Sequence, residues 1–285
     1  MRVASLNRIQ APLVIIHEDQ CYQIPAGDPW PKDMLELIRD FEKLHDPLVK
    51  LIHESDPISW SVNDLAAPIS NCEKVICIGK NYALHAKEMG GEPPTIPVVF
   101  SKFASVINRP GGPVVIPSLS QQLDYEAELV VVIGKPGRNI ARQQAFEHVF
   151  GYCCGNDITA RDWQKGKPGG QWLLGKSCDT FAPLGPYIVT ADEVPDPHNL
   201  SIQLRVNGEL RQDSNTSHLI FPIDFLIAHL SQFFTLRPGD LIFTGTPPGV
   251  GAARSPQLFL KNGDQVEVRI EGLGVLNSHV VDKLP

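Results

Sequence analysis

The pattern of apolar and polar residues divides the chain into a mixed N-terminal part and a longer part rich in short strands. Residues 13–16 and 21–24 are apolar runs separated by polar residues, which predicts a β-hairpin. Between residues 32 and 53 the apolar side chains recur every three or four positions, which predicts a helix with one apolar face. Proline removes a hydrogen bond from a helix interior, so we expect Pro47 to divide this segment into two helices.

Beyond residue 73, short apolar runs alternate with turns that contain glycine and proline. Seven runs predict strands and two longer segments predict helices: strands at 75–78, 98–100, 114–116, 129–133, 202–206, 241–243 and 266–270, and helices at 142–149 and 222–234. Regular helices do not separate these strands, so a doubly wound sheet is not favoured. We expect an α+β fold, with a small N-terminal α/β unit over residues 1–66 and a β-rich mixed domain over residues 70–285.

Composition excludes several classes of protein. The net charge is −7 and basic residues do not cluster, so a nucleic-acid partner is not expected. No apolar run is long enough for a transmembrane helix, so no membrane partner is expected either. The N-terminus lacks the apolar stretch of a secretory signal, which favours the cytoplasm, or the mitochondrial matrix of a eukaryote after removal of a presequence. The six cysteines form no C-x-x-C pair and are expected to be reduced, buried thiols.

The segment 124–134 combines acidic residues with a β-branched apolar run. Side chains alternate along a strand, so Glu126 and Glu128 should face the same side. Two buried like charges without partners cost roughly several kcal/mol each unless a cation compensates them. The pattern alone also fits a strand end that emerges into solvent.

A third acid, Asp157, follows the apolar stretch that begins near residue 149. Three carboxylates without a histidine or cysteine ligand form an oxygen-only set, which suits Mg²⁺, Mn²⁺ or Ca²⁺ rather than zinc. The sequence therefore indicates a metal centre.

His85 and Glu88 lie three residues apart in a segment, 81–89, that predicts a short helix with Asn81 as its N-cap. A carboxylate beside an imidazole raises its basicity and fixes its tautomer, so this pair could move a proton near neutral pH. An exposed surface pair without a catalytic role fits the spacing as well.

Four ordered stretches resemble the fumarylacetoacetate hydrolase family: 75–82 with the two residues His85 and Glu88, then 125–129, 156–162 and 245–251. The resemblance extends from about residue 70 to the end of the chain. It implies a β-roll catalytic domain, usually a homodimer, that holds Mg²⁺ or a similar ion such as Mn²⁺.

The resemblance also implies roles for individual residues. Glu126, Glu128 and Asp157 would hold the metal, His85 and Glu88 would be the acid/base pair, and Lys176 would stabilise developing negative charge. Four further residues would position the substrate or a water molecule: Lys102, Arg161, Gln164 and Thr246.

Two of these roles have structural alternatives, and one part of the site departs from the family. Arg161 could instead pair with Asp162, and Thr246 could simply complete a Gly/Pro turn. The longest family members have a further acidic ligand before the histidine helix, where this chain has Lys80 between a glycine and an asparagine. The cation should therefore be more open to substrate and water.

The expected substrate is a small 2-oxo acid with a second carbonyl or carboxyl group. Hydrolysis of a C–C bond, of the acylpyruvate or fumarylpyruvate type, is the first expectation. Keto–enol tautomerisation or decarboxylation of oxaloacetate would use the same groups, so both remain alternatives. A non-catalytic binding module is disfavoured, because it would not need so many buried charges. A nicotinamide dehydrogenase is disfavoured because the strand–G-x-G-x-x-G–helix unit is missing.

Overall fold

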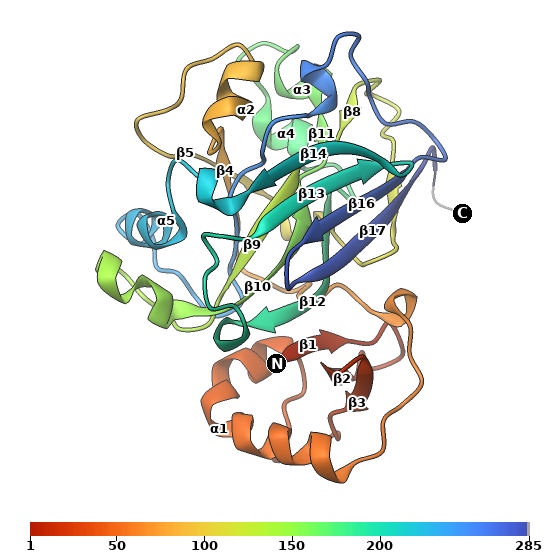
Figure 1. Cartoon of the computed structure of the whole chain (residues 1–285), viewed down its shortest axis with the longest axis vertical. Coiled ribbons are helices and arrows are strands. Elements are labelled where there is room, and N and C mark those ends of the chain that lie inside the picture. The colour runs from red at the N-terminus through yellow and green to blue at the C-terminus, as the bar shows by residue number, and fades with distance from the viewer. Residues whose placement is uncertain (284–285) are drawn as a thin grey trace.

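A ten-stranded mixed sheet extends through most of the chain in the computed structural model, which describes residues 1–283 (Figure 1). Its strand order is β3-β2-β1-β12-β10-β9-β15-β4-β5, with β6 paired to β12. The strands are β1 (Arg2–Ser5), β2 (Leu13–His17), β3 (Gln20–Gln23), β4 (Val75–Gly79), β5 (Val98–Lys102), β6 (Ile107–Asn108), β9 (Ala127–Ile133), β10 (Val149–Asn156), β12 (Ala182–Thr190) and β15 (Leu241–Phe243).

A second, five-stranded sheet has the order β14-β13-β16-β17-β7, and β8 and β11 form a separate pair. The strands are β7 (Pro113–Val115), β8 (Leu123–Asp124), β11 (Thr159–Ala160), β13 (Ser201–Val206), β14 (Glu209–Asn215), β16 (Gln265–Ile270) and β17 (Gly274–Val281). The predicted α+β class, with mixed sheets and few helices, is confirmed.

Three central strands carry the core of the large sheet. Every residue of β9, β10 and β12 is buried, which explains why β9 is apolar on both faces. Glu128 lies within β9 and Glu126 directly before it, so both carboxylates enter the protein interior at one end of this strand.

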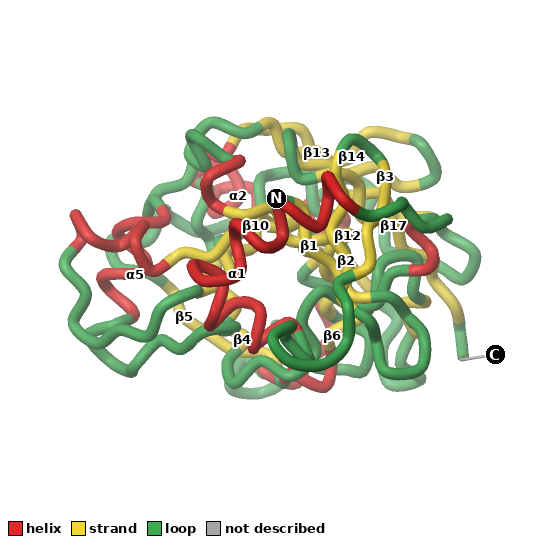
Figure 2. The backbone as a smooth tube through the Cα atoms, turned by 90° about the horizontal axis from the view of Figure 1, so that it is seen from below, coloured by secondary structure: helices red, strands yellow, loops and turns green. Residues whose placement is uncertain are grey.

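The N-terminal strands continue the large sheet. The predicted hairpin is confirmed as β2 and β3, and β1 pairs antiparallel with β12. Figure 2 views the molecule from the end that carries this part, with α1 (Met34–Glu54) in front of the strands. Phe41 of α1 meets Phe150 of β10 edge to face, with ring centroids 5.1 Å apart. The boundary expected between residues 66 and 70 stays a prediction.

The prediction that Pro47 divides the first helical segment is wrong, because α1 is continuous over 21 residues. Pro47 lies on the exposed side of the helix, while Leu44 and Leu48 on either side of it are buried. The side chain of Asp33 also caps the first turn by accepting from the backbone N–H of Glu36 at 2.9 Å. Packing and capping thus offset the one hydrogen bond that proline removes.

The remaining helices are short: α2 (Ala83–Glu88), α3 (Arg161–Gln164), α4 (Trp172–Lys176) and α5 (Ile223–Leu230). The prediction of Asn81 as N-cap is wrong, since Tyr82 takes that place. Asn81 is instead buried and bonds the backbone of Phe221 and Thr244. The segment expected as a helix at 142–149 is 3₁₀ over Arg142–His148, and the one expected at 222–234 is the shorter α5.

All six cysteines are free thiols, five of them buried and Cys178 half-buried. No helix among residues 1–283 combines the length and the apolar character that crossing a lipid bilayer requires.

Candidate active site

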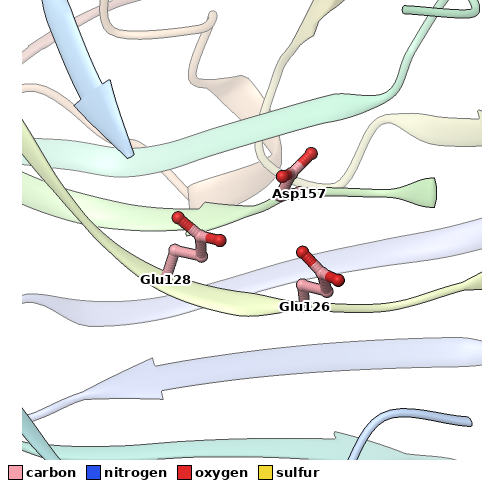
Figure 3. A group of neighbouring side chains, drawn as sticks. All are labelled: Glu126, Glu128 and Asp157. Atoms are coloured by element: carbon pink, nitrogen blue, oxygen red, sulfur yellow. The ribbon is translucent and has the colours of Figure 1, made fainter. Parts of the chain in front are cut away.

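Three carboxylates meet at the end of β9, as the sequence predicts. Glu126, Glu128 and Asp157 each place one ligand oxygen within 4.8 Å of the others, and all three are buried. Figure 3 shows both glutamates pointing to the same side of one strand, toward Asp157.

The antiparallel register of β9 and β10 explains why Asp157 lies next to the two glutamates. Asn156 pairs with Ala127, so Asp157, one residue further, lies opposite Glu126. The backbone N–H of Asp157 donates to the carbonyl of Glu126 at 2.9 Å, and the backbone N–H of Glu126 donates to the side chain of Asn156 at 3.0 Å. These bonds fix the two carboxylates before any ligand binds.

Buried cations surround two of the three carboxylates. Lys176, on α4, donates to Glu126 and to Asp157 at 2.7 Å each. Lys102, at the end of β5, donates to Asp157 and to the carbonyl of Ile158. Glu128 accepts the backbone N–H of Gly245 at 2.8 Å, without a cation among the described residues that pairs with it.

The pKa values follow these contacts. Burial by itself raises the pKa of Glu126, but Lys176 and Arg161 outweigh burial and hold that pKa below its ordinary value. Burial, and then the charges of Asp157 and Glu126, raise the pKa of Glu128 well above its ordinary value. Of the three carboxylates, Glu128 is therefore the one whose ionised form the metal-free protein favours least.

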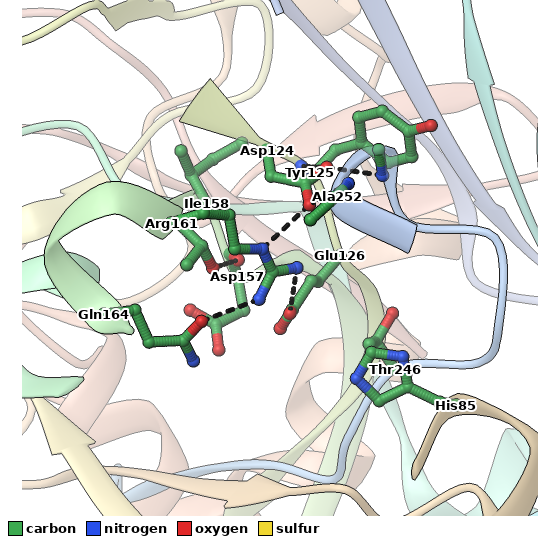
Figure 4. Close-up of polar contacts among 12 residues, drawn as sticks. His85, Asp124, Tyr125, Glu126, Asp157, Ile158, Arg161, Gln164, Thr246 and Ala252 are labelled. Atoms are coloured by element: carbon green, nitrogen blue, oxygen red, sulfur yellow. Dashed lines mark hydrogen bonds and ion pairs between the residues drawn. The ribbon is translucent and has the colours of Figure 1, made fainter. Parts of the chain in front are cut away.

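Arg161 connects the cluster of three carboxylates to a fourth buried acid, Asp124 (Figure 4). Its guanidinium donates to Asp124 at 2.8 Å, to Glu126 at 2.7 Å and to Gln164 at 2.9 Å. Asp124 also accepts the backbone N–H groups of residues 125, 251 and 252. The alternative of an ion pair between Arg161 and Asp162 is wrong, because Asp162 bonds residues 120 and 121 instead.

Thr246 belongs to a network that the sequence did not reveal. The buried amide of Gln212, on β14, donates to the Thr246 hydroxyl at 2.8 Å and to the carbonyl of Pro247 at 2.7 Å. Its amide oxygen accepts the N–H of Ala127, the residue between the two glutamates, at 2.8 Å. Gln212 thus joins the acidic strand to the loop of Thr246.

His85 and Glu88 form the expected pair on α2. His85 Nδ1 lies 2.8 Å from a carboxylate oxygen of Glu88, and His85 is buried. The second oxygen of Glu88 accepts the N–H of Gly249 at 2.8 Å, so the carboxylate is held from two sides. His85 and Thr246, both labelled in Figure 4, line the same cavity.

A cavity of about 30 Å³ unites these groups, room for about one or two water molecules. Its lining includes, from the predicted residues, His85, Glu126, Glu128, Arg161, Gln164, Lys176 and Thr246. Three further predicted residues do not line the cavity but bond residues of the site: Glu88 bonds His85, Asp157 bonds Lys176, and Lys102 bonds Asp157. A larger hollow of about 650 Å³ adjoins it and shares Met89, Arg161 and Lys165 with it.

Sequence reasoning missed Asp124, Asn156 and Gln212. Asp124 is the last residue of β8 and stands two positions before Glu126, and Asn156 is the last residue of β10 and stands directly before Asp157, so their position was a usable signal. Gln212 lies in a polar strand and gave no signal.

The donor set fits a divalent cation. Three buried carboxylates with oxygen atoms so close together repel one another, and burial together with this repulsion raises the pKa of Glu128. Oxygen ligands of this kind suit a hard cation. The chain can therefore hold a divalent cation at Glu126, Glu128 and Asp157.

Comparison with known proteins places the chain in a family. Residues 74–281 match the family described as fumarylacetoacetate (FAA) hydrolase C-terminal. A relative from Xenopus laevis, named mitochondrial oxaloacetate tautomerase fahd2, is 53% identical over 224 residues, which cover 79% of this chain and 70% of the relative. One from Pongo abelii, named fumarylacetoacetate hydrolase domain-containing protein 2, is 54% identical over 215 residues, 75% of this chain and 68% of the relative.

Solved structures share the fold over the whole length. Maleylpyruvate hydrolase from Sphingobium sp. SYK-6, in complex with manganese(II) and pyruvate, superposes with a TM-score of 0.82 at 33% identity and covers 99% of both chains. The family match spans well over half of this chain and coincides with the part that carries the three carboxylates, the histidine pair and Lys176. The chain belongs to the fumarylacetoacetate hydrolase family.

Proposed function

We propose that this enzyme catalyses the keto–enol tautomerisation of oxaloacetate or a closely similar 2-oxo acid. The observation that carries the proposal is the His85–Glu88 pair, which shares one small cavity with the carboxylate cluster. The relative named oxaloacetate tautomerase, at 53% identity, supports this reaction over the expected C–C hydrolysis.

Tautomerisation moves one proton between C3 and the 2-oxygen, and no other atom enters or leaves. In the keto-to-enol direction, His85 can accept the proton from C3 and return a proton to the 2-oxygen, and the reverse reaction exchanges the two positions. Glu88 keeps the imidazole oriented and stabilises its charged form. Lys176 supplies a fixed positive charge beside the carboxylates. A divalent cation, when bound, adds positive charge close to the reacting 2-oxo group.

The cavity of about 30 Å³ is smaller than a 2-oxo acid, so a bound substrate also occupies part of the adjoining hollow of about 650 Å³. Tautomerisation needs no water molecule beside the substrate, whereas hydrolysis does.

Hydrolysis of a C–C bond remains the second candidate, because the structural relative that binds manganese and pyruvate is named a maleylpyruvate hydrolase. Decarboxylation of oxaloacetate is the third. The three reactions differ in their products, so one set of assays separates them.

The test follows enol absorbance, CO₂ release and cleavage of acetylpyruvate and fumarylpyruvate, each with Mg²⁺ and with Mn²⁺. We expect faster loss of the enol form of oxaloacetate without CO₂ or cleavage. His85→Ala should lower the tautomerisation rate by about 100-fold or more, the usual contribution of a positioned acid or base. His218→Ala is the control, since His218 is exposed and its ring bonds Ser214 on the surface. Cleavage or CO₂ as the main product, or a fully active His85→Ala protein, would contradict the proposal.

A further inference from the structure

Two lysines line the active-site cavity without a part in the proton transfer. Lys80 lies between β4 and α2, and Lys165 directly follows α3. Both share the cavity lining with His85 and the two glutamates. Lys80 is half-buried, and Lys165 is partly desolvated at the cavity but keeps an exposed surface, so both can meet a ligand that enters from the hollow outside.

The carboxylates around the cavity already have other partners. Glu126 and Asp157 bond Lys176, Arg161 and Lys102. Glu88 bonds His85 and Gly249. Within residues 1–283, neither Lys80 nor Lys165 forms an ion pair with any of these acids.

Lys165 lies near other cations, and Lys80 has a strained backbone conformation. Burial, and then the charges of Arg161 and Lys80, lower the pKa of Lys165. The backbone of Lys80 has φ of 57°, a left-handed conformation that is uncommon for a residue with a side chain. Asn81 beside it is anchored by three hydrogen bonds to Phe221 and Thr244. The backbone strain at Lys80 persists because the anchored residue beside it enforces it. Lys165 lies close to Arg161 and Lys80, which disfavours its charged form.

The charges around the cavity match a ligand with two negative charges. Asp124, Glu126, Glu128 and Asp157 face three buried cations, so a bound divalent cation leaves one positive charge in excess. That excess balances one carboxylate. At the rim, the charges of Lys167 and Asp162 cancel, and Lys80 and Lys165 exceed the single negative charge of Glu88 by one, which balances a second carboxylate.

We propose that Lys80 and Lys165 form a subsite for a second carboxylate, which makes the enzyme prefer 2-oxo dicarboxylic acids to 2-oxo monocarboxylic acids. This inference deepens the proposed function and rests on it for the orientation of the substrate, with the 2-oxo acid end at the carboxylate cluster. The edge-to-face pair of Trp172 and Phe100, with ring centroids 5.3 Å apart, provides an apolar wall beside the lysines. Low polarity there strengthens the attraction between charges.

The experiment measures binding separately from turnover. Malate and lactate share a 2-hydroxy acid group and differ in the distal carboxylate, and neither is an enolisable 2-oxo acid. Their dissociation constants for the Mn²⁺-loaded protein are measured by calorimetry. We expect malate to bind about 10-fold or more tightly, the gain expected from one charge-assisted hydrogen bond.

Variants then assign the preference to the two lysines. Lys80→Met and Lys165→Met should each reduce the malate-to-lactate ratio several-fold and leave lactate binding almost unchanged, whereas Lys165→Arg should retain the ratio. Lys167→Met is the matched control, because Lys167 lies two residues away and stacks over Trp163, with Nζ 5.1 Å from the ring centroid. Thermal unfolding of each variant verifies that it is folded.

The outcomes separate this inference from the proposed function. Equal affinity for malate and lactate, an unchanged ratio in both Met variants, or an equal loss in Lys167→Met would overturn the subsite. A ratio that depends on the two lysines in a protein that does not tautomerise oxaloacetate would support the subsite and reject the proposed reaction. In the kinetic arm, the Met variants should raise KM for oxaloacetate more than they lower kcat, with little effect on its 4-methyl ester.

Discussion

Glu128 is the residue whose charge the protein compensates least. Glu126 and Asp157 each bond two cationic side chains, whereas Glu128 accepts only one backbone N–H among its described contacts. Burial and the neighbouring carboxylates raise its pKa well above 4.5. The free energy of the ionised group is therefore unfavourable in the folded, metal-free protein.

Replacement of Glu128 by glutamine should stabilise the metal-free protein. A group with a raised folded pKa contributes stability that is complete below its unfolded pKa and is lost as pH rises through the folded pKa. The advantage of Glu128→Gln should thus be small near pH 5 and grow toward pH 8, to about 1–4 kcal/mol, the range seen when neutral groups replace buried ions. Urea unfolding in the presence of a chelator at both pH values measures it. An advantage that shrinks with rising pH would show that Glu128 is compensated in another way.

Individual site residues were predictable where the signal is local. Strand alternation places Glu126 and Glu128 on one side, and a spacing of three places His85 beside Glu88. Gln212 was not predictable, because its partners Ala127 and Thr246 lie far away in the sequence.

At the scale of elements, β14 supports the site through one side chain. Gln212 connects β14 to the start of β9 and to the loop after β15. Because all these atoms are buried, none of them can recover a bond to water if the amide is lost.

Gln212→Leu should therefore cost stability and weaken the site together. Each buried group left unpaired costs about 1–3 kcal/mol, and the free energy of unfolding in urea should fall by that order. The affinity for Mn²⁺ should fall as well, because Ala127 lies between two ligands. Gln203→Leu is the control, since Gln203 on the neighbouring strand bonds Asp213 near the surface. Equal stability of both variants would refute the supporting role of Gln212.

The elements that the sequence predicted are those with a clear apolar period. β12 escaped prediction because two prolines and a glycine interrupt it, and β14 because most of its side chains are polar. The helix α1 is continuous, contrary to the prediction, because burial of its apolar face outweighs the low helix propensity of Pro47.

At the scale of the molecule, the site unites segments that are distant in the chain. The carboxylates come from β9 and the end of β10, while the lysines come from β5 and α4. Strand order in the large sheet, including the pairing of β1 with β12, depends on contacts between remote segments. Patterns of neighbouring residues do not encode such pairings, so the sequence predicted the class of fold without its topology. The expected homodimer stays a prediction.

Because the site joins these segments, a bound cation should stabilise the whole fold. A ligand that binds only the folded protein adds about 2.7 kcal/mol at one hundred times its dissociation constant. With an unfolding entropy of about 2.1 cal/mol/K per residue, or about 0.6 kcal/mol/K for 285 residues, this stabilisation should raise Tm by about 4–5 °C with Mn²⁺ or Mg²⁺, and a chelator should reverse the increase. In Glu128→Gln, which lacks one ligand but folds without the repulsion of Glu128, the increase should nearly vanish although the metal-free Tm is higher. Differential scanning calorimetry of the wild-type and Glu128→Gln proteins measures the increase in Tm. If the cation raises Tm equally in both, the stabilising cation binds elsewhere than at the three carboxylates.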